Sequence, residues 1–136
     1  MNVWGMKDVA LFDPWTFIHI LGGIVLGTIL FSILKNHEKT DRIKISILVI
    51  LIMAYSWEAT EMLIEIGFLG ETLKHWFWGV EYLPNRIIID PLATMGGFFL
   101  FLKKPNLGKI SLFLYLIWWI VHIFIFPNAV YLQQII

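Results

Sequence analysis

Long apolar stretches separated by short polar segments dominate this chain. A membrane-spanning helix needs about 20 apolar residues, which the first, second and fourth stretches supply. The pattern therefore predicts an all-α, polytopic membrane protein with a single domain, residues 1–136, folded as a four-helix transmembrane bundle. The predicted spans cover approximately residues 14–34, 45–69, 86–102 and 110–132.

The third stretch is the shortest, and a proline lies near its start. Asp90-Pro91 resembles a helix start, with an Asp N-cap and Pro in the first turn. A helix beginning at Asp90 would reach Lys103 after about 12 residues, or about 18 Å, which is too short to cross a bilayer alone. We therefore expect a helix that begins near Asn85 and is kinked at Pro91. The alternative is extended backbone over residues 85–89, shielded by protein.

Local signals also shape the other predicted helices. Asp13-Pro14 offers an N-cap and a first-turn proline, so Asp13 is favoured as a cap over a ligand. Gly23 and Gly27 have Gly-x-x-x-Gly spacing, and Gly96-Gly97 gives the third stretch a similar surface. Small residues let helices approach closely, so we expect these glycines to pack helices together, either within one chain or between chains.

The basic residues are distributed unevenly over the predicted loops. Seven of the ten lie on the side opposite the termini, which the positive-inside rule makes cytoplasmic. We therefore expect an integral, multi-pass protein, located in the plasma membrane, with both termini extracytoplasmic. The seven residues are Lys35, Lys39, Arg42, Lys44, Lys103, Lys104 and Lys109.

The loop between the second and third stretches is rich in aromatic residues, including Trp76, Phe77, Trp78 and Tyr82. Aromatic clusters beside a membrane helix usually lie at the level of the lipid headgroups. We therefore expect an interfacial aromatic loop here rather than a ligand site.

The composition narrows the class of protein further. Hydrophobic residues make up 59% of the 136 residues and the formal net charge is zero, which is far too apolar for a soluble domain. Zero charge also argues against a nucleic-acid partner, because phosphate binding needs a basic face. The chain has no cysteine, which excludes thiolate ligands and a cysteine nucleophile. Residues 1–12 lack the apolar core of a cleaved signal peptide, so we expect the first helix to direct insertion.

The second stretch carries acidic residues that are expensive in a membrane helix. Glu58, Glu61 and Glu65 fall within about 60° of one another at about 100° per residue, so a helix directs them to one side. The predicted topology places them in the outer half of the bilayer together with His19 and Asp90. A charge near the bilayer centre costs about 3 kcal/mol or more. We therefore expect Glu58 and Glu61 to face a functional site, whereas Glu65 is close enough to the surface to reach the headgroups.

Several acids in a low-dielectric environment cannot all stay ionised without a counter-charge. Three solutions remain open, namely shared protons, pairing with Arg86 or a protonated histidine, and a bound divalent metal. Histidine with carboxylates suits zinc, iron or manganese, and an all-oxygen set suits calcium or magnesium. No His-x-x-x-His or Glu-x-x-His spacing selects a metal, so its identity is unknown. His122, alone beside Trp118 and Trp119, is expected to hydrogen-bond between helices.

Three short groups of residues follow one another along the chain in a recognisable order. They are Asp13-Pro14-Trp15 with His19 and Gly23, then Trp57-Glu58-x-x-Glu61, then Asn85-Arg86-Ile87-x-x-Asp90 followed by Gly96-Gly97. This order resembles the VanZ-like family of small bacterial and archaeal membrane proteins, and related families of similar size. The resemblance implies an association with resistance to glycopeptides such as teicoplanin. It also implies a family-typical polar set of His19, Glu58, Glu61, Asn85, Arg86 and Asp90.

These observations predict a polar site that binds or acts on a lipid-linked or cell-envelope molecule. The candidate catalytic residues are Glu58, Glu61, Asp90 and His19, with either glutamate as general acid or base. Arg86 and Asn85 are the candidate contacts to an anionic headgroup of the substrate. Two other functions remain open, a proton- or ion-coupled carrier and a structural subunit of a larger membrane complex. The expected partners are membrane lipids, with a homo-oligomer or other membrane subunits as alternatives.

Overall fold

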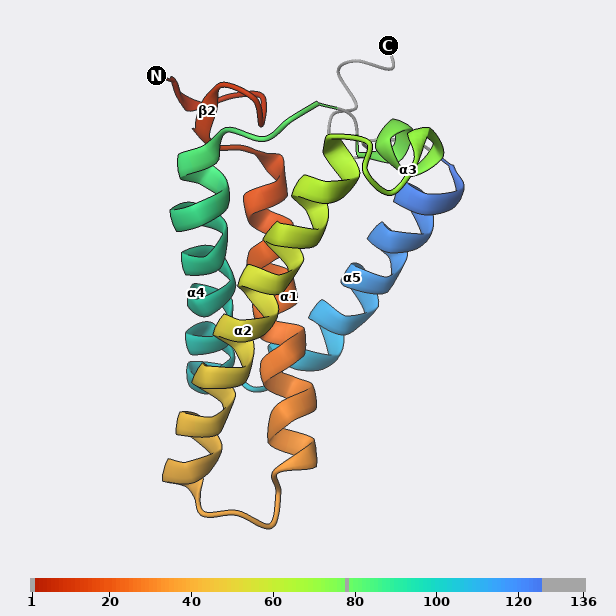
Figure 1. The fold of residues 1–136 in the computed structure, drawn as a ribbon. Helices are drawn as coiled ribbons and strands as arrows, with labels where there is room; N and C mark the ends of the chain where they lie inside the picture. The colour runs from red at the N-terminus through yellow and green to blue at the C-terminus, as the bar shows by residue number, and fades with distance from the viewer. Residues whose placement is uncertain (1, 78, 126–136) are drawn as a thin grey trace.

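Long helices and one small strand pair form the computed structural model, which describes residues 2–77 and 79–125 (Figure 1). Two short strands, β1 (Asn2–Trp4) and β2 (Ala10–Phe12), pair in parallel at one end. The helices, in chain order, are α1 (Pro14–Ile33), α2 (Lys39–Glu65), α3 (Glu71–Trp76), the π-helix η1 (Asn85–Ile89), α4 (Asp90–Lys103) and α5 (Leu107–Phe124).

The four long helices alternate in direction. The strands, α3 and η1 therefore lie at one end of the molecule, and the short connections 34–38 and 104–106 lie toward the other (Figure 1). Four helical segments are long and apolar enough to cross a membrane, which agrees with the sequence pattern: α1, α2, η1 together with α4, and α5.

The first helix begins where the sequence predicts it. The backbone N–H of Thr16 donates to the Asp13 carboxylate at 3.2 Å, and the backbone N–H of Asp13 donates to the Thr16 hydroxyl at 3.3 Å. The expectation that Asp13 is an N-cap is therefore confirmed. The second helix begins six residues earlier than predicted, at Lys39, and ends at Glu65, just before Gly67 adopts a φ of 82°. The predicted end of the fourth helix near residue 132 lies outside the described residues.

Residues 85–89 are helical, so the extended alternative is wrong. The π-helix η1 runs directly into α4, and Asp90 has helical backbone angles of φ −70° and ψ −40°. Asp90 is therefore a residue within a continuous helical segment and not an N-cap. The kink expected at Pro91 stays a prediction.

α1 and α4 approach so closely that their backbones touch. A Cβ placed on Gly23 would lie 1.9 Å from the carbonyl oxygen of Thr94, and one placed on Gly97 would lie 2.0 Å from that of Ile20. The small-residue surfaces predicted from the sequence therefore pack against each other within one chain. This close crossing brings the start of α4 beside the first two turns of α1.

An aromatic cluster joins α1, α2, α5 and the segment after α3. Its members are Trp15, Trp57, Phe77, Trp118, Trp119 and His122. Phe77, from the loop expected at the headgroup level, is buried and stacks on Trp15 with ring centroids 6.0 Å apart. Trp78 lies outside the described residues, and an interfacial position for the loop stays a prediction.

His122 is fully buried in this aromatic cluster. Its ring stacks on Trp118 at a centroid distance of 5.1 Å, and neither ring nitrogen has a hydrogen-bond partner within residues 2–77 and 79–125. The interhelical hydrogen bond expected for His122 is therefore not found in the described part of the chain. Aromatic packing holds this side chain instead.

Candidate functional site

Three ionisable side chains from three helices converge below the strand pair. His19 lies in the second turn of α1, Glu58 lies about two turns before the end of α2, and Asp90 is the first residue of α4. Nε2 of His19 is 3.1 Å from Oδ2 of Asp90 and 3.6 Å from Oε1 of Glu58. Each side chain is at least nine-tenths buried. We call these three residues the inner cluster.

Thr94 supports the inner cluster from the opposite side of the imidazole. Its hydroxyl donates to the backbone carbonyl of Asp90 at 2.9 Å and lies 3.4 Å from Nδ1 of His19. Because the hydroxyl hydrogen is used by the carbonyl, Thr94 can only accept from Nδ1–H. In a neutral ring this assignment leaves Nε2 as an unprotonated acceptor. The Thr16 hydroxyl lies 3.5 Å from Oδ1 of Asp90, so the N-cap residues of α1 also contact the cluster.

A second group of charges, the outer network, lies closer to the end of the molecule and is centred on Glu65. The Glu65 carboxylate accepts hydrogen bonds from the Lys7 ammonium, the Arg86 guanidinium and, at 3.0 Å, the backbone N–H of Glu81. Nζ of Lys7 also donates to the carbonyl of Phe77 at 2.9 Å. The outer network comprises Lys7, Glu61, Glu65, Glu81, Asn85 and Arg86.

Arg86 connects the outer network to the inner cluster. One guanidinium nitrogen lies 3.1 Å from Oε2 of Glu81, and the other donates to the backbone carbonyl of Glu58 at 3.3 Å. Asn85 donates its side-chain amide hydrogen to Oε1 of Glu81 at 2.8 Å. Both candidate headgroup contacts therefore already bind side chains of the chain itself.

Glu81 lies in the loop before η1 and is buried. Burial, together with the nearby carboxylates of Asp90 and Glu61, raises the pKa of Glu81 to about 11. Glu81 is therefore protonated at neutral pH. Glu65 is the carboxylate that pairs with both Lys7 and Arg86.

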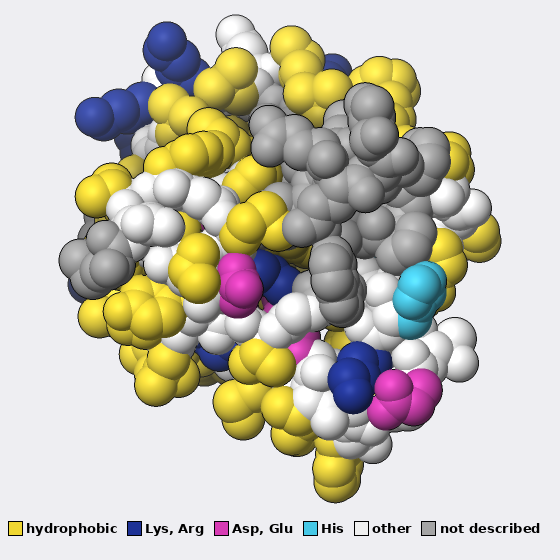
Figure 2. Space-filling view, turned by 90° about the horizontal axis from the view of Figure 1, so that it is seen from above, with side chains coloured by type: hydrophobic (Ala, Val, Ile, Leu, Met, Phe, Trp, Pro, Cys, Tyr) yellow, Lys and Arg dark blue, Asp and Glu magenta, His cyan; other side chains and the backbone are white. Residues whose placement is uncertain are grey.

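Few of these charges reach the surface at this end of the molecule. Seen from above, scattered acidic and basic side chains emerge among hydrophobic and uncharged ones (Figure 2). Lys7, Glu65 and Arg86 are each less than one-tenth exposed. The outer network therefore lies inside the protein, between the strand pair and the inner cluster.

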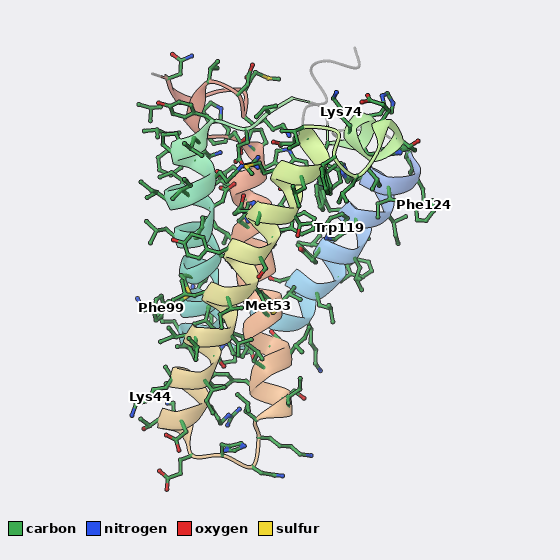
Figure 3. The ribbon with its side chains drawn as sticks, in the orientation of Figure 1. Lys44, Met53, Lys74, Phe99, Trp119 and Phe124 are labelled. Atoms are coloured by element: carbon green, nitrogen blue, oxygen red, sulfur yellow. The ribbon has the colours of Figure 1, made fainter. Side chains whose placement is uncertain are left out.

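An apolar cavity of about 380 Å³ opens between α1, α2 and α5 and reaches the inner cluster. Met53 from α2 and Trp119 from α5 belong to its facing walls (Figure 3). His19 and Thr94 form its polar inner wall, and Trp15, Trp57 and Trp119 join it to the aromatic cluster. One side chain, His19, thus belongs both to the cavity and to the inner cluster.

The structure brings together the helices that the sequence predicts, but it separates the predicted polar residues into two groups. His19, Glu58 and Asp90 meet as expected, whereas the Glu61 carboxylate turns toward Lys7, with Oε1 3.9 Å from Nζ. Glu65 does not reach the headgroup level freely, because it is buried in the outer network. The candidate roles in catalysis and substrate binding stay predictions.

Four contributing residues were not anticipated, namely Lys7, Thr16, Glu81 and Thr94. Thr16 and Thr94 had a usable local signal. Each follows an acidic residue by one helical turn, Asp13 and Asp90 respectively, where side chains on a helix meet. Lys7 and Glu81 lie in segments without a periodic pattern, and nothing local indicates their partners.

Comparisons with known protein families, with curated proteins and with solved structures find no match for this chain, so the resemblance to VanZ-like proteins rests on the residues quoted for it.

Proposed function

We propose that this chain is a four-helix plasma-membrane protein, similar to VanZ-like proteins, that binds an amphipathic lipid-linked or cell-envelope molecule. The apolar part of the ligand lies in the cavity between α1, α2 and α5. Its polar part lies against His19 and the adjoining inner cluster.

The observation that carries this proposal is the junction of an apolar cavity with buried ionisable groups. A volume of about 380 Å³ falls in the range of small-molecule sites, which combine apolar walls with a few convergent polar groups. The cavity walls are mostly apolar and aromatic, and the polar atoms of His19 and Thr94 lie at the inner side. An amphipathic ligand matches both parts of this lining.

The charge distribution of the loops supports an orientation for the proposed membrane protein. The connections 34–38 and 104–106 and the helix ends beside them carry most of the lysines, which favours the cytoplasmic side. The inner cluster and the cavity would then lie in the outer half of the bilayer. From that depth, the site would meet molecules of the outer leaflet.

A chemical step on the bound molecule would use the inner cluster. Glu58 or Asp90 would serve as general acid or base, and His19 would hold the two carboxylates in place. Arg86 acts as a positioning residue in this proposal, because it holds the backbone carbonyl of Glu58.

Photocrosslinking of a lipid tests the proposed binding. The protein is reconstituted in vesicles of phosphatidylethanolamine and phosphatidylglycerol, the latter carrying a diazirine in one acyl chain. We expect strong labelling of the cavity residue Trp57 relative to the exposed Ile52, which contacts bulk lipid in this proposal.

A filled cavity provides the matched comparison. Ala54→Leu places a larger side chain in the cavity, whereas Ala59→Leu makes the same change at an exposed position of the same helix. We expect Ala54→Leu to lower the labelling of Trp57 several-fold and Ala59→Leu to leave it unchanged. Equal labelling of Trp57 in both variants would refute the proposal.

A further inference from the structure

We propose that the inner cluster, formed by His19, Glu58 and Asp90, is a binding site for a divalent first-row transition-metal ion. The ligand atoms are Nε2 of His19 and one carboxylate oxygen from each acid. This inference rests on the geometry of the cluster alone and does not require the proposed lipid ligand.

The spacing of the ligand atoms fits a coordination sphere. Zinc and similar ions bind imidazole nitrogen and carboxylate oxygen at about 2.0–2.2 Å, so neighbouring ligand atoms lie about 3.0–3.4 Å apart in octahedral or tetrahedral sites. The two measured separations from Nε2 of His19 are 3.1 Å to Asp90 and 3.6 Å to Glu58. All three ligand atoms lie within 4.8 Å of one another. Only small side-chain adjustments separate this arrangement from a metal site.

The hydrogen bonds around His19 orient it as a ligand. Thr94 accepts from Nδ1–H, so in a neutral ring the lone pair of Nε2 faces the two carboxylates. Metal-binding histidines usually donate the other ring N–H in this way, which sets the tautomer and the ring orientation. Three acceptor atoms directed at one point repel one another unless a cation lies between them.

Three of the four carboxylate oxygens of the inner cluster lack a hydrogen-bond donor in the described part of the chain. These oxygens are both carboxylate oxygens of Glu58 and Oδ2 of Asp90. The two side chains are only 4% and 1% exposed, so bulk water does not replace the missing donors. Leaving a buried carboxylate unsatisfied is costly, and metal coordination is one of the ways in which proteins satisfy it.

The surrounding charge also favours a cation. Six buried carboxylic acids accompany two buried basic side chains in the described part of the chain, and burial keeps one of these acids, Glu81, neutral at pH 7. Lys7 and Arg86 are already paired with acids of the outer network, both with Glu65 and Lys7 also with Glu61. The inner cluster therefore contains no lysine or arginine, and the imidazole of His19 is its one basic group beside two carboxylates.

A proton on His19 is the competing occupant, but it can reach only one of the two acids. Protonated Nε2 reaches Asp90 at 3.1 Å, but the 3.6 Å separation from Glu58 is too long for a hydrogen bond. A proton thus satisfies one acid, whereas a metal ion reaches both. The ligand set of one nitrogen and two oxygens, without sulfur, favours zinc, manganese or iron over copper(I).

Titration with Co²⁺ and Zn²⁺ alone tests this inference. The full chain is purified in detergent, stripped with a chelator and titrated with Co²⁺, with absorbance and elemental analysis as readouts. We expect one Co²⁺ per chain, displaced by Zn²⁺. X-ray absorption of the Zn²⁺-loaded wild type should report one imidazole and oxygen ligands at about 2.0–2.2 Å, a result that depends on no variant.

Matched variants separate this site from adventitious binding. His19→Gln and Glu58→Gln should weaken Co²⁺ binding at least about 100-fold, whereas His75→Gln and Glu71→Gln make the same changes at exposed positions of α3 and should have no effect. Thr94→Val, which removes a group that positions His19, should weaken binding by about 10- to 100-fold.

Several results would overturn the inference. They are a wild type that binds no stoichiometric ion, a Zn²⁺ spectrum without imidazole, and wild-type affinity in His19→Gln. Because no lipid enters these measurements, they fail or succeed independently of the crosslinking test.

Discussion

Adjacent glycines of α4 provide a direct measurement of how closely α1 and α4 pack. Gly97 faces α1, where an added Cβ would lie 2.0 Å from the carbonyl oxygen of Ile20, whereas an added Cβ on Gly96 meets no atom within 4 Å. Ordinary contacts of a Cβ begin at 3.4 Å. Gly97→Ala must therefore separate the two backbones by about 1.4 Å, the difference between these distances, because neither carbonyl nor Cβ can rotate away.

The magnitude follows from the comparison of the two variants. Replacing Gly by Ala gains about 1 kcal/mol of helix propensity at either position, so this contribution cancels in the difference. What remains is the overpacking cost of Gly97→Ala, about 1–3 kcal/mol. We expect Gly96→Ala to be as stable as the wild type or more stable, and Gly97→Ala to be less stable than Gly96→Ala by that amount.

Unfolding of the detergent-solubilised protein by SDS, followed by circular dichroism, measures these differences. The same experiment on α1 provides an independent pair. Gly23→Ala should be destabilising, because its Cβ would lie 1.9 Å from the carbonyl oxygen of Thr94, and Gly22→Ala should be tolerated, because its Cβ would lie 3.6 Å from the Tyr115 ring. Equal stability within both pairs would show that α1 and α4 do not cross at these glycines.

Two further predictions concern the outer network and the orientation of the chain. Glu65→Gln removes the negative charge that pairs with Lys7 and Arg86, so SDS unfolding should show a loss of about 3–5 kcal/mol of stability. The same change at the exposed Glu71 should alter stability by less than about 0.5 kcal/mol. Equal stability of the two variants would contradict the central role of Glu65. Because the chain has no cysteine, single cysteines can report its orientation. A membrane-impermeant maleimide applied to intact cells should label Glu71→Cys and not Asn36→Cys, and the reverse pattern would show that the proposed orientation is inverted.

The parts of the fold that sequence reasoning predicted well depend on local chemistry. The start of α1 follows from Asp13 and Pro14, whose effect on helix initiation needs no tertiary contact. The start of α2 was missed because hydropathy detects the apolar part of a helix, and the polar residues from Lys39 to Lys44 continue the helix beyond it. The end of an apolar stretch therefore marks the edge of the hydrophobic part of a helix and not the end of the helix itself.

The sequence predicts the candidate site only through the depth of each residue in its predicted membrane span. Depth brought His19, Glu58 and Asp90 to one level, and they are in contact distance. Depth could not separate Glu58 from Glu61, which lies about 4.5 Å further along the helix and about 60° around it. That displacement is enough to direct Glu61 to Lys7, a residue with no signal in the sequence.

The position of Lys7 has a consequence for the order in which the protein assembles. Its hydrogen-bond partners Glu65 and Phe77 follow it by 58 and 70 residues, so Lys7 is synthesised long before either exists. Until about half of the chain has left the ribosome, this ammonium group must stay hydrated. The N-terminal strand pair can therefore close over the helices only late, after α2 and the loop beyond it are in place. Lys7 is thus made before its partners and reaches its final position only after them.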